Sequence, residues 1–540
     1  MIRDTQEADR HFLYSEGRDY VVDGFLRLPS YEIDTDRMVI HDVVWGDCVI
    51  QARTEYEGAN EQEPSDDYDA LLLELAQSPL FVRLQAVEQL TFSERFSTVP
   101  NTSRFSRWQH IWGSLVFARK MTENDPRFSP RDRIVAQLRT LFWDVGQTAF
   151  SHLGDWIFQG IQGGEDLHDK DLKALLAAFD VESLLGRYGL TIEETVFPDT
   201  EDWVECPSPD LCIDRLDYGL REILRWACPP IPLHYFSSAL RDPKQLFMID
   251  DQMRLIVKDR KFARYLAAGY GLLPADDWSH PTHRVQMELM QMAVKGALLE
   301  KSEDTGAHVR ELLYLVDSDF DPYFAQWSGT WFGNLMQSVA YEQRRIFTIA
   351  RKPDLEIIFA GIQADEWEFP VFPEPLTAHS WASRQFGDYP LPAQLSVERT
   401  EGVQQYMRAA ERGLEIGLPR LKPRRVDPLV LVGDKTKRLS EVEPSYERFL
   451  TGQNQFMETS FKATIHMRED VAERAIVQCH AIDERWAEAI RQGRSSDMLR
   501  KTVGSAALAL CLQPNRAFDR VSLAPRYRSQ LNSLDDVTLF

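Results

Sequence analysis

The sequence feature that most constrains the fold is a helical spacing of apolar residues, which dominates the chain from Tyr68 onward. Apolar residues that recur three and four positions apart form one stripe along a helix, and that stripe is buried against the protein core. The helices predicted in this way cover residues 68–77, 80–90, 104–121, 130–150, 169–176, 210–227, 285–301 and 331–351. We therefore expect a mainly α-helical protein.

Two parts of the chain depart from this helical pattern. Residues 37–51 alternate apolar and polar side chains among β-branched ones, which predicts a short hairpin or strand pair. Around residues 352–400 Pro, Phe and Trp become frequent and the helical spacing disappears. We expect an N-terminal segment with a short β element (1–66), a helical domain (67–350), and a mixed α/β C-terminal region (351–540) that acts as an insertion or in oligomerisation.

The composition excludes several classes of function. The chain has 84 acidic and 61 basic residues, a net charge of −23 at pH 7. Such a charge disfavours broad binding to nucleic acids or to anionic membranes. Six cysteines without closely spaced pairs are typical of a reducing compartment, and no apolar stretch is long enough to span a bilayer. We expect a cytoplasmic, soluble protein that does not contact membranes.

Two patches near the middle of the helical region combine histidine with charged side chains. Arg107 and His110 are three residues apart, so both project from one face of a helix. The segment 141–156, LFWDVGQTAFSHLGDW, follows. The residues of this segment whose side chains can act in catalysis or metal binding are Asp144, Ser151, His152 and Asp155. Taken alone, Arg107 and His110 are typical of an ordinary polar helix face. The segment 141–156 lacks the G-x-S-x-G motif of a serine hydrolase.

Two further patches follow along the chain. His168 comes after a glycine-rich loop, and the segment 214–222 reads DRLDYGLRE. At helical spacing this segment places Asp214, Tyr218, Arg221 and Glu222 on one face. Burying these polar side chains would cost free energy. The simpler interpretation is a solvent-exposed helix stabilised by ion pairs between residues four apart. The chain contains no P-loop, dinucleotide fingerprint, HExxH motif or EF-hand.

In their order along the chain, the patches resemble the HD-domain superfamily, and within it the deoxynucleoside triphosphate triphosphohydrolases, which include bacterial dGTPases and the vertebrate antiviral dNTPase. That family has a histidine, then HDxGHxPFSHxxD, then a DxxDY helix. This chain has His110, then WDVGQTAFSHLGD at 143–155, then DRLDY at 214–218. The segment 78–90, SPLFVRLQAVEQL, is also similar to the family. The resemblance covers roughly residues 38–300.

The resemblance implies a role for each matching position. The metal ligands would be His110, Asp144 and Asp214, and the groups that act as acid or base or orient water would be His152, Asp155 and His168. The substrate contacts would be Arg107 and Arg215 on phosphate, Gln89 and Glu222 near the sugar 3′-hydroxyl, and Tyr218 on the deoxyribose face. The cofactor would be a divalent metal, namely Mg, Mn, Fe or Zn.

The family also implies an activity and an assembly. Its members split a deoxynucleoside triphosphate into deoxynucleoside and triphosphate, and they form symmetric oligomers. We therefore expect an HD-type helical body, a dNTP substrate and a homo-oligomer. Lowering of nucleotide pools, for instance in antiviral defence against phage, is implied by the resemblance alone.

Two positions depart from the family pattern. Trp143 stands where the family has the histidine of its HD dyad, and an indole does not ligate a metal. Gln147 replaces the later histidine. Three protein ligands still suffice in catalytic zinc sites, so a hydrolase is our leading hypothesis. The alternative is a degenerate HD protein that binds nucleotide as a regulatory or scaffold subunit beside an active partner subunit.

Overall fold

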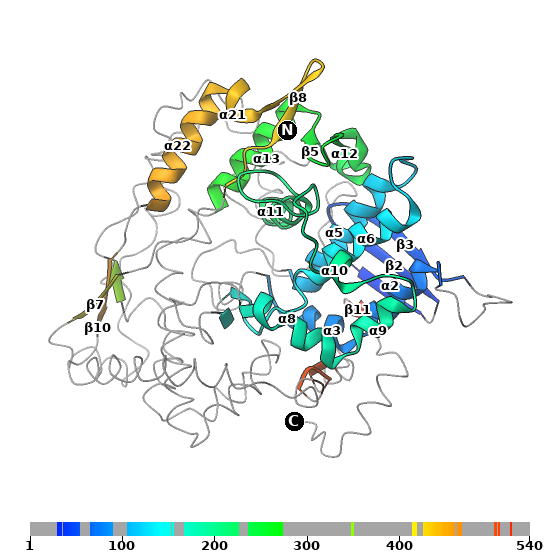
Figure 1. The fold of residues 1–540 in the computed structure, drawn as a ribbon. Helices are drawn as coiled ribbons and strands as arrows, with labels where there is room; N and C mark the ends of the chain where they lie inside the picture. Colours follow the sequence, from blue (N-terminus) through cyan, green and yellow to red (C-terminus); the bar gives the residue numbers. More distant parts are fainter. Residues whose placement is uncertain are drawn as a thin grey trace, which may run out of the picture.

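The protein is represented by a computed structural model, which describes residues 30–34, 36–53, 65–89, 105–152, 154–155, 167–225, 236–273, 347–349, 413–417, 425–458, 462–466, 500, 502–504, 506–507 and 519–520. Within these residues the protein is mostly helical, with a small N-terminal sheet and a mixed sheet that includes C-terminal strands (Figure 1). The predicted fold class is confirmed. Within the described ranges, no helix is both long and apolar enough to cross a membrane.

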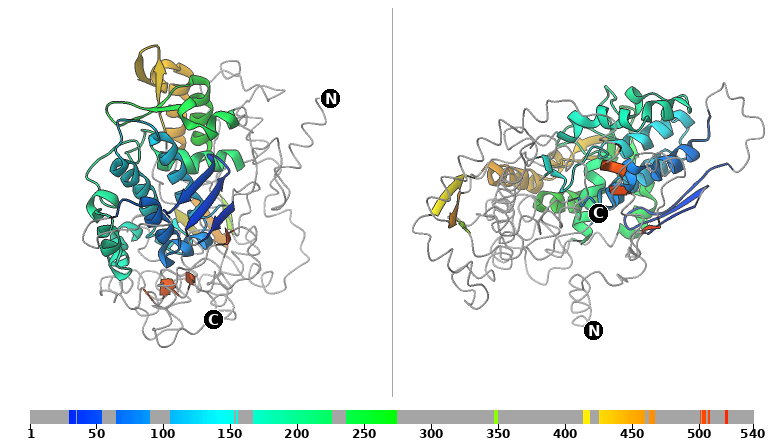
Figure 2. Two further views of the ribbon diagram at one scale, coloured as in Figure 1. Left: turned by 90° about the vertical axis from the view of Figure 1, so that its right-hand side faces the viewer. Right: turned by 90° about the horizontal axis from the view of Figure 1, so that it is seen from below.

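The predicted N-terminal hairpin is present. Strands β2 (Arg37–Asp42) and β3 (Gly46–Gln51) pair antiparallel, and alternate side chains of each are buried. Strand β1 (Ser30–Ile33) pairs antiparallel with β2, and β11 (Asp519–Arg520) runs parallel to β1. Figure 2 shows these strands along one edge of the helical body.

Two long helices form the centre of the helical body. Helices α5 (Arg107–Thr122) and α6 (Pro130–Phe142) pack against each other. Each begins at a capping box, in which Ser106 or Ser129 accepts a hydrogen bond from the backbone N–H three residues later. The predicted helix 130–150 is too long, because residues 143–146 form a turn directly after α6.

Helices on both sides of this pair complete the body. Helix α11 (Ile213–Arg225) packs between α5 and α13 (Arg260–Leu273). The other helices of this part are α2 (Tyr68–Ala76), α3 (Pro79–Val82), η1 (Arg83–Ala86), α8 (Leu167–Ala178), α9 (Val181–Gly186), α10 (Ile192–Thr195), α12 (Ser237–Arg241) and η4 (Pro243–Gln245). The predicted helix 285–301 lies outside the described residues. Of the predicted helix 331–351, the described residues form strand β6 (Phe347–Ile349) instead.

Chain segments from beyond residue 400 pack onto the helical body. Strand β8 (Leu429–Val432) pairs parallel with β5 (Leu255–Val257), in a sheet of order β4-β5-β8-β9. The remaining elements are β4 (Phe247–Ile249), β9 (Lys435–Arg438), α21 (Leu439–Val442), α22 (Pro444–Glu458), β7 (Gly413–Gly417) and β10 (Lys462–His466). The boundary expected near residue 350 falls among residues outside the described ranges and stays a prediction.

Candidate functional site

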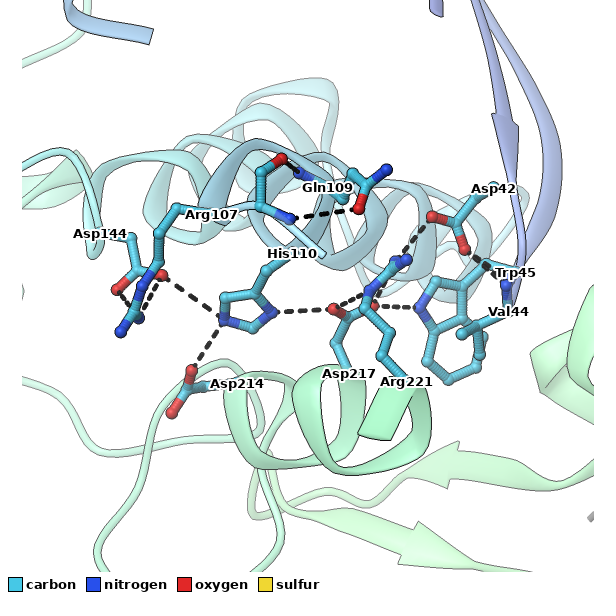
Figure 3. A network of polar contacts seen from close by, with 11 residues as sticks. Asp42, Val44, Trp45, Arg107, Gln109, His110, Asp144, Asp214, Asp217 and Arg221 are labelled. Carbon is cyan, nitrogen blue, oxygen red and sulfur yellow. Dashed lines mark hydrogen bonds and ion pairs between the residues drawn. The ribbon is translucent and has the colours of Figure 1, made fainter. Parts of the chain in front are cut away.

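The candidate site is centred on His110, in the first turn of α5. The capping box at Ser106 fixes where this helix begins, and so fixes the direction in which Arg107 and His110 project. His110 is fully buried. Its ring is held from both sides by carboxylates that come from other parts of the chain (Figure 3).

Three aspartates surround the imidazole of His110. The Nδ1 atom lies 2.8 Å from Asp217 Oδ2. On the other side of the ring, Nε2 lies 3.1 Å from Asp214 Oδ1 and 3.8 Å from Asp144 Oδ2. The structure therefore brings together all three residues predicted as metal ligands, His110, Asp144 and Asp214.

Asp217 determines which nitrogen of His110 carries a proton. Its carboxylate accepts hydrogen bonds from Trp45 Nε1 at 2.6 Å, from Arg221 Nη2 at 2.9 Å and from Arg221 Nε at 2.7 Å. An ionised carboxylate only accepts, so the contact to His110 is an Nδ1–H donor. A neutral His110 then turns the Nε2 lone pair toward the carboxylates of Asp144 and Asp214, which is unfavourable unless a proton or a cation lies there.

The pKa of His110 reflects this arrangement. Burial lowers the pKa of the imidazole, but hydrogen bonds to Asp214 and Asp217 outweigh burial and raise it to about 9. In the absence of another cation, the ring is therefore protonated at neutral pH. A divalent ion would supply positive charge at the same position.

Arg107 holds the second predicted ligand, Asp144. Its Nη1 lies 2.9 Å from each carboxylate oxygen of Asp144, and both side chains are buried. Its other nitrogens donate to Ser151 Oγ at 3.1 Å and to the backbone carbonyl of Gln89 at 3.2 Å. Arg107 thus lies inside the site, where it orients Asp144. Its predicted contact with phosphate stays a prediction.

Trp143 lies beside His110. The two rings are stacked, with 5.5 Å between their centroids and an interplanar angle of 20°. The turn after α6 places Trp143 and Asp144 next to each other, so the indole takes a position against the imidazole while the aspartate reaches Nε2. Among the described residues, the Trp143 Nε1 atom is buried and has no hydrogen-bond partner.

The structure locates the remaining predicted residues to different degrees. His152 Nδ1 lies 3.5 Å from Asp155 Oδ2, so the structure places these two residues side by side, and their expected roles stay predictions. The ring of Tyr218 packs edge-on against His110 at 5.8 Å, and its hydroxyl hydrogen-bonds that of Tyr270. The side chains of Gln89 and Glu222 are buried. His168 falls in α8, but its side chain lies outside what the structure describes.

Arg215 contacts a different part of the molecule. Its guanidinium donates to the backbone carbonyls of Cys206 and Asp210 and contacts the sulfur of Cys212 at 3.2 Å. These contacts hold the loop that leads into α11. The expected role of Arg215 on phosphate stays a prediction.

Four residues to which the motif comparison gave no role, Asp42, Trp45, Asp217 and Arg221, form a buried network behind His110. Arg221 Nη2 donates to Asp42 Oδ2 at 2.6 Å, and Trp45 Nε1 donates to Asp217. Asp217 and Arg221 are four apart on α11, a spacing that signals an ion pair. Asp42 and Trp45 lie in the hairpin turn, more than 170 residues before Asp217 in the sequence. No local sequence pattern links them to the site.

The donor set fits a divalent ion by its chemistry. One imidazole and two carboxylates face each other, and a further carboxylate, Asp217, orients the imidazole as is usual for metal-ligating histidines. In the structure these side chains are closed on one another. Accordingly, within the described ranges no group of three or more His, Cys, Asp or Glu side chains is spaced around a metal position. Binding would require Asp144 and Asp214 to separate around the ion.

Comparison with known proteins finds distant relatives in sequence. No protein-family model matches the chain. It is 27% identical over 232 residues to the uncharacterized protein YdhJ of Bacillus subtilis, which covers 43% of this chain and 65% of that protein. It is 26% identical over 236 residues to the metal-dependent phosphohydrolase cns2 of Cordyceps militaris, which covers 43% of this chain and 63% of that protein. The chain thus spans slightly less than two thirds of the length of these relatives.

Solved structures with distant similarity include a phosphohydrolase from Bacteroides thetaiotaomicron, with a TM-score of 0.49 and 14% identity over 80% of this chain and 100% of that one. A hypothetical protein from Aquifex aeolicus gives a TM-score of 0.43 and 14% identity over 82% of this chain and 99% of that one. One of the two sequence relatives is named a metal-dependent phosphohydrolase, and the similarity to it is distant. Neither relative's name specifies a substrate.

Proposed function

We propose that this protein is a metal-dependent phosphohydrolase that splits a deoxynucleoside triphosphate into deoxynucleoside and triphosphate. The observation that carries the proposal is the convergence of His110 Nε2 with Asp144 Oδ2 and Asp214 Oδ1, at 3.8 and 3.1 Å. The similarity to a metal-dependent phosphohydrolase supports the reaction class. The choice of a deoxynucleotide rests on the motif order and on the buried tyrosine, Tyr218.

The site residues would divide the work in the following way. His110, Asp144 and Asp214 would hold a divalent ion, which supplies Lewis acidity to the phosphoryl group when bound. Arg107 orients Asp144 and places positive charge beside an anionic substrate. His152, paired with Asp155, is suited to give a proton to the leaving oxygen. Tyr218 would pack against the sugar.

Two observations favour the second candidate function, a nucleotide-binding subunit without catalysis. Trp143 fills the position of a metal ligand with its ring against His110. Arg107 already neutralises the carboxylate of Asp144. In this case the nucleotide would bind without turnover, and an active partner subunit would supply the chemistry.

The test is metal content of the purified protein by elemental analysis, together with triphosphate release from a dNTP mixture with Mn²⁺ or Mg²⁺. We expect stoichiometric metal and released triphosphate, both lost in His110→Gln. The matched control is His41→Gln, because His41 also pairs with an aspartate but lies at the surface, 2.8 Å from Asp47. Nucleotide binding without metal or turnover would overturn the enzyme and favour the regulatory subunit.

A further inference from the structure

We propose that Asp42 and Arg221 are positioning residues for the site, which act on His110 through Asp217. The N-terminal hairpin would then be part of the machinery that presents His110 Nε2 to its ligands. This inference rests on the proposed function for its effect on metal binding, but the arrangement of His110 itself is testable without metal or substrate.

The network is continuous from the hairpin to His110 (Figure 3). Asp42 Oδ1 accepts from the backbone N–H groups of Val44 and Trp45, each at 2.8 Å, and this closes the hairpin turn. Asp42 Oδ2 accepts from Arg221 Nη2 at 2.6 Å. Arg221 and Trp45 then contact the same carboxylate, Asp217, from two directions. The turn therefore fixes both groups that hold Asp217.

Asp217 has little freedom once these contacts are made. Its Oδ1 accepts from Trp45 and Arg221, and its Oδ2 accepts from Arg221 and from His110 Nδ1. Four donors match the four lone-pair sites of a carboxylate. The position of Oδ2, and with it the rotation of the His110 ring, is therefore set by Arg221 and Trp45.

Burial and charge argue that this network does more than pack two elements together. The side chains of Asp42, Asp217 and Arg221 are all fully buried. Asp42 and Asp217 share one guanidinium, so Arg221 alone does not neutralise both carboxylates. Positive charge on His110 or beside its Nε2 adds to the balance at Asp217, and Lys120 interacts electrostatically with Asp42. Burying these carboxylates is costly unless such charges stay paired with them.

Helix α5 is shaped to admit the network. A Cβ on Gly113, three residues after His110, would lie 1.6 Å from Arg221 Nη2 and 2.9 Å from Asp217 Oδ1. Glycine at this position lets the guanidinium cross α5 between Asp217 and Asp42. The substitution Gly113→Ala would therefore disturb the same network from the opposite side.

The experiment compares Asp42→Asn with Asp202→Asn. Asparagine keeps the Oδ1 acceptor of the hairpin turn and removes the charge that faces Arg221. Asp202 is a matched control, since its Oδ1 accepts from Val204 N at 2.8 Å and its Oδ2 pairs with Arg139 at 2.5 Å. The first readout is the ring N–H signal of His110 in histidine-labelled, metal-free protein by NMR, assigned with His110→Gln. The second is the binding constant of Mn²⁺.

We expect Asp42→Asn, and likewise Gly113→Ala, to shift the His110 Nδ1–H signal and speed its exchange with water. We expect a loss in Mn²⁺ affinity of about 10- to 100-fold, as for other groups that orient a metal-ligating histidine. Asp202→Asn should change neither readout. An unchanged His110 signal in folded Asp42→Asn overturns the positioning role. A wild-type protein that binds no Mn²⁺ overturns the proposed function instead, and the His110 signal still decides the positioning role.

Discussion

At the scale of single residues, the indole of Trp143 lies where a metal-ligating histidine is expected from the motif. It stacks on His110, and among the described residues its buried Nε1 has no hydrogen-bond partner. The ring therefore contributes a stacked apolar wall but no metal-ligand atom. A histidine in its place would add an imidazole beside His110, Asp144 and Asp214.

We predict that Trp143→His increases Mn²⁺ affinity by about tenfold or more, because an imidazole at this position adds a fourth protein ligand to His110, Asp144 and Asp214. Trp143→Phe is the control, since it keeps the stacked ring without a ligand atom. Isothermal titration with Mn²⁺ measures the change. A rise in triphosphate release with the tighter binding would identify a decayed enzyme, whereas lost turnover would mean that the tryptophan belongs to a rebuilt site. Equal affinities for Trp143→His and wild type would contradict the prediction.

At the scale of secondary-structure elements, the start of α5 decides the geometry of the site. Arg107 and His110 both lie in its first turn, and Ser106 fixes the register of that turn. Helix α6 has an equivalent capping box at Ser129, which lies at its N-terminus, whereas Asp144 follows its C-terminus. The two caps have the same chemistry but different distances from the site in sequence.

We predict that Ser106→Ala and Ser129→Ala each lower the free energy of unfolding by about 1 kcal/mol, the usual cost of losing an N-cap. Only Ser106→Ala should also weaken Mn²⁺ binding, because only that cap positions His110. Urea unfolding and metal titration on both variants measure the two effects. Equal losses of metal affinity in the two variants would show that the cap acts through general stability.

At the scale of the whole molecule, the C-terminal segment 425–458 completes the helical body. Strand β8 pairs with β5, and Gln453 Nε2 donates to the backbone carbonyl of Gly271 in α13 at 3.1 Å. Phe449 in α22 is fully buried, and a Cβ on Gly271 would lie 2.3 Å from its ring. These contacts connect segments that are more than 150 residues apart in the chain.

We predict that Phe449→Ala lowers the free energy of unfolding by about 3–5 kcal/mol, the range for losing a buried phenylalanine. Because α22 shares a core with α13, the helical body should unfold together with the C-terminal segment in one shifted transition. Differential scanning calorimetry measures this. Val49→Ala, at an exposed position of β3, is the control and should shift the transition little. Two separate transitions, with only one shifted, would indicate that the segment folds independently.

Elements that depend on local patterns of side chains were predictable from the sequence. The spacing of apolar residues predicts α2, α5, α8 and α11 to within a few residues, and alternation predicts the β2–β3 hairpin, because each pattern reports one buried face. The predicted helix 130–150 extended beyond the end of α6 at Phe142, because apolar residues in the turn 143–146 continue the helical spacing. The motif resemblance assigned His110, Asp144 and Asp214 to one metal site; the structure places these side chains together, and their role as ligands stays a prediction.

The contacts that hold those residues in place come from long-range packing. Asp42 reaches Arg221 across 179 positions of the chain, and Arg107 turns inward onto Asp144. Both contacts depend on how the hairpin and the helices pack, and such contacts leave no periodic pattern in the sequence. A residue type and its local spacing determine which groups are available to a site. Long-range packing determines which charge each group faces, and so whether His110 Nε2 meets a proton, a metal ion or a substrate.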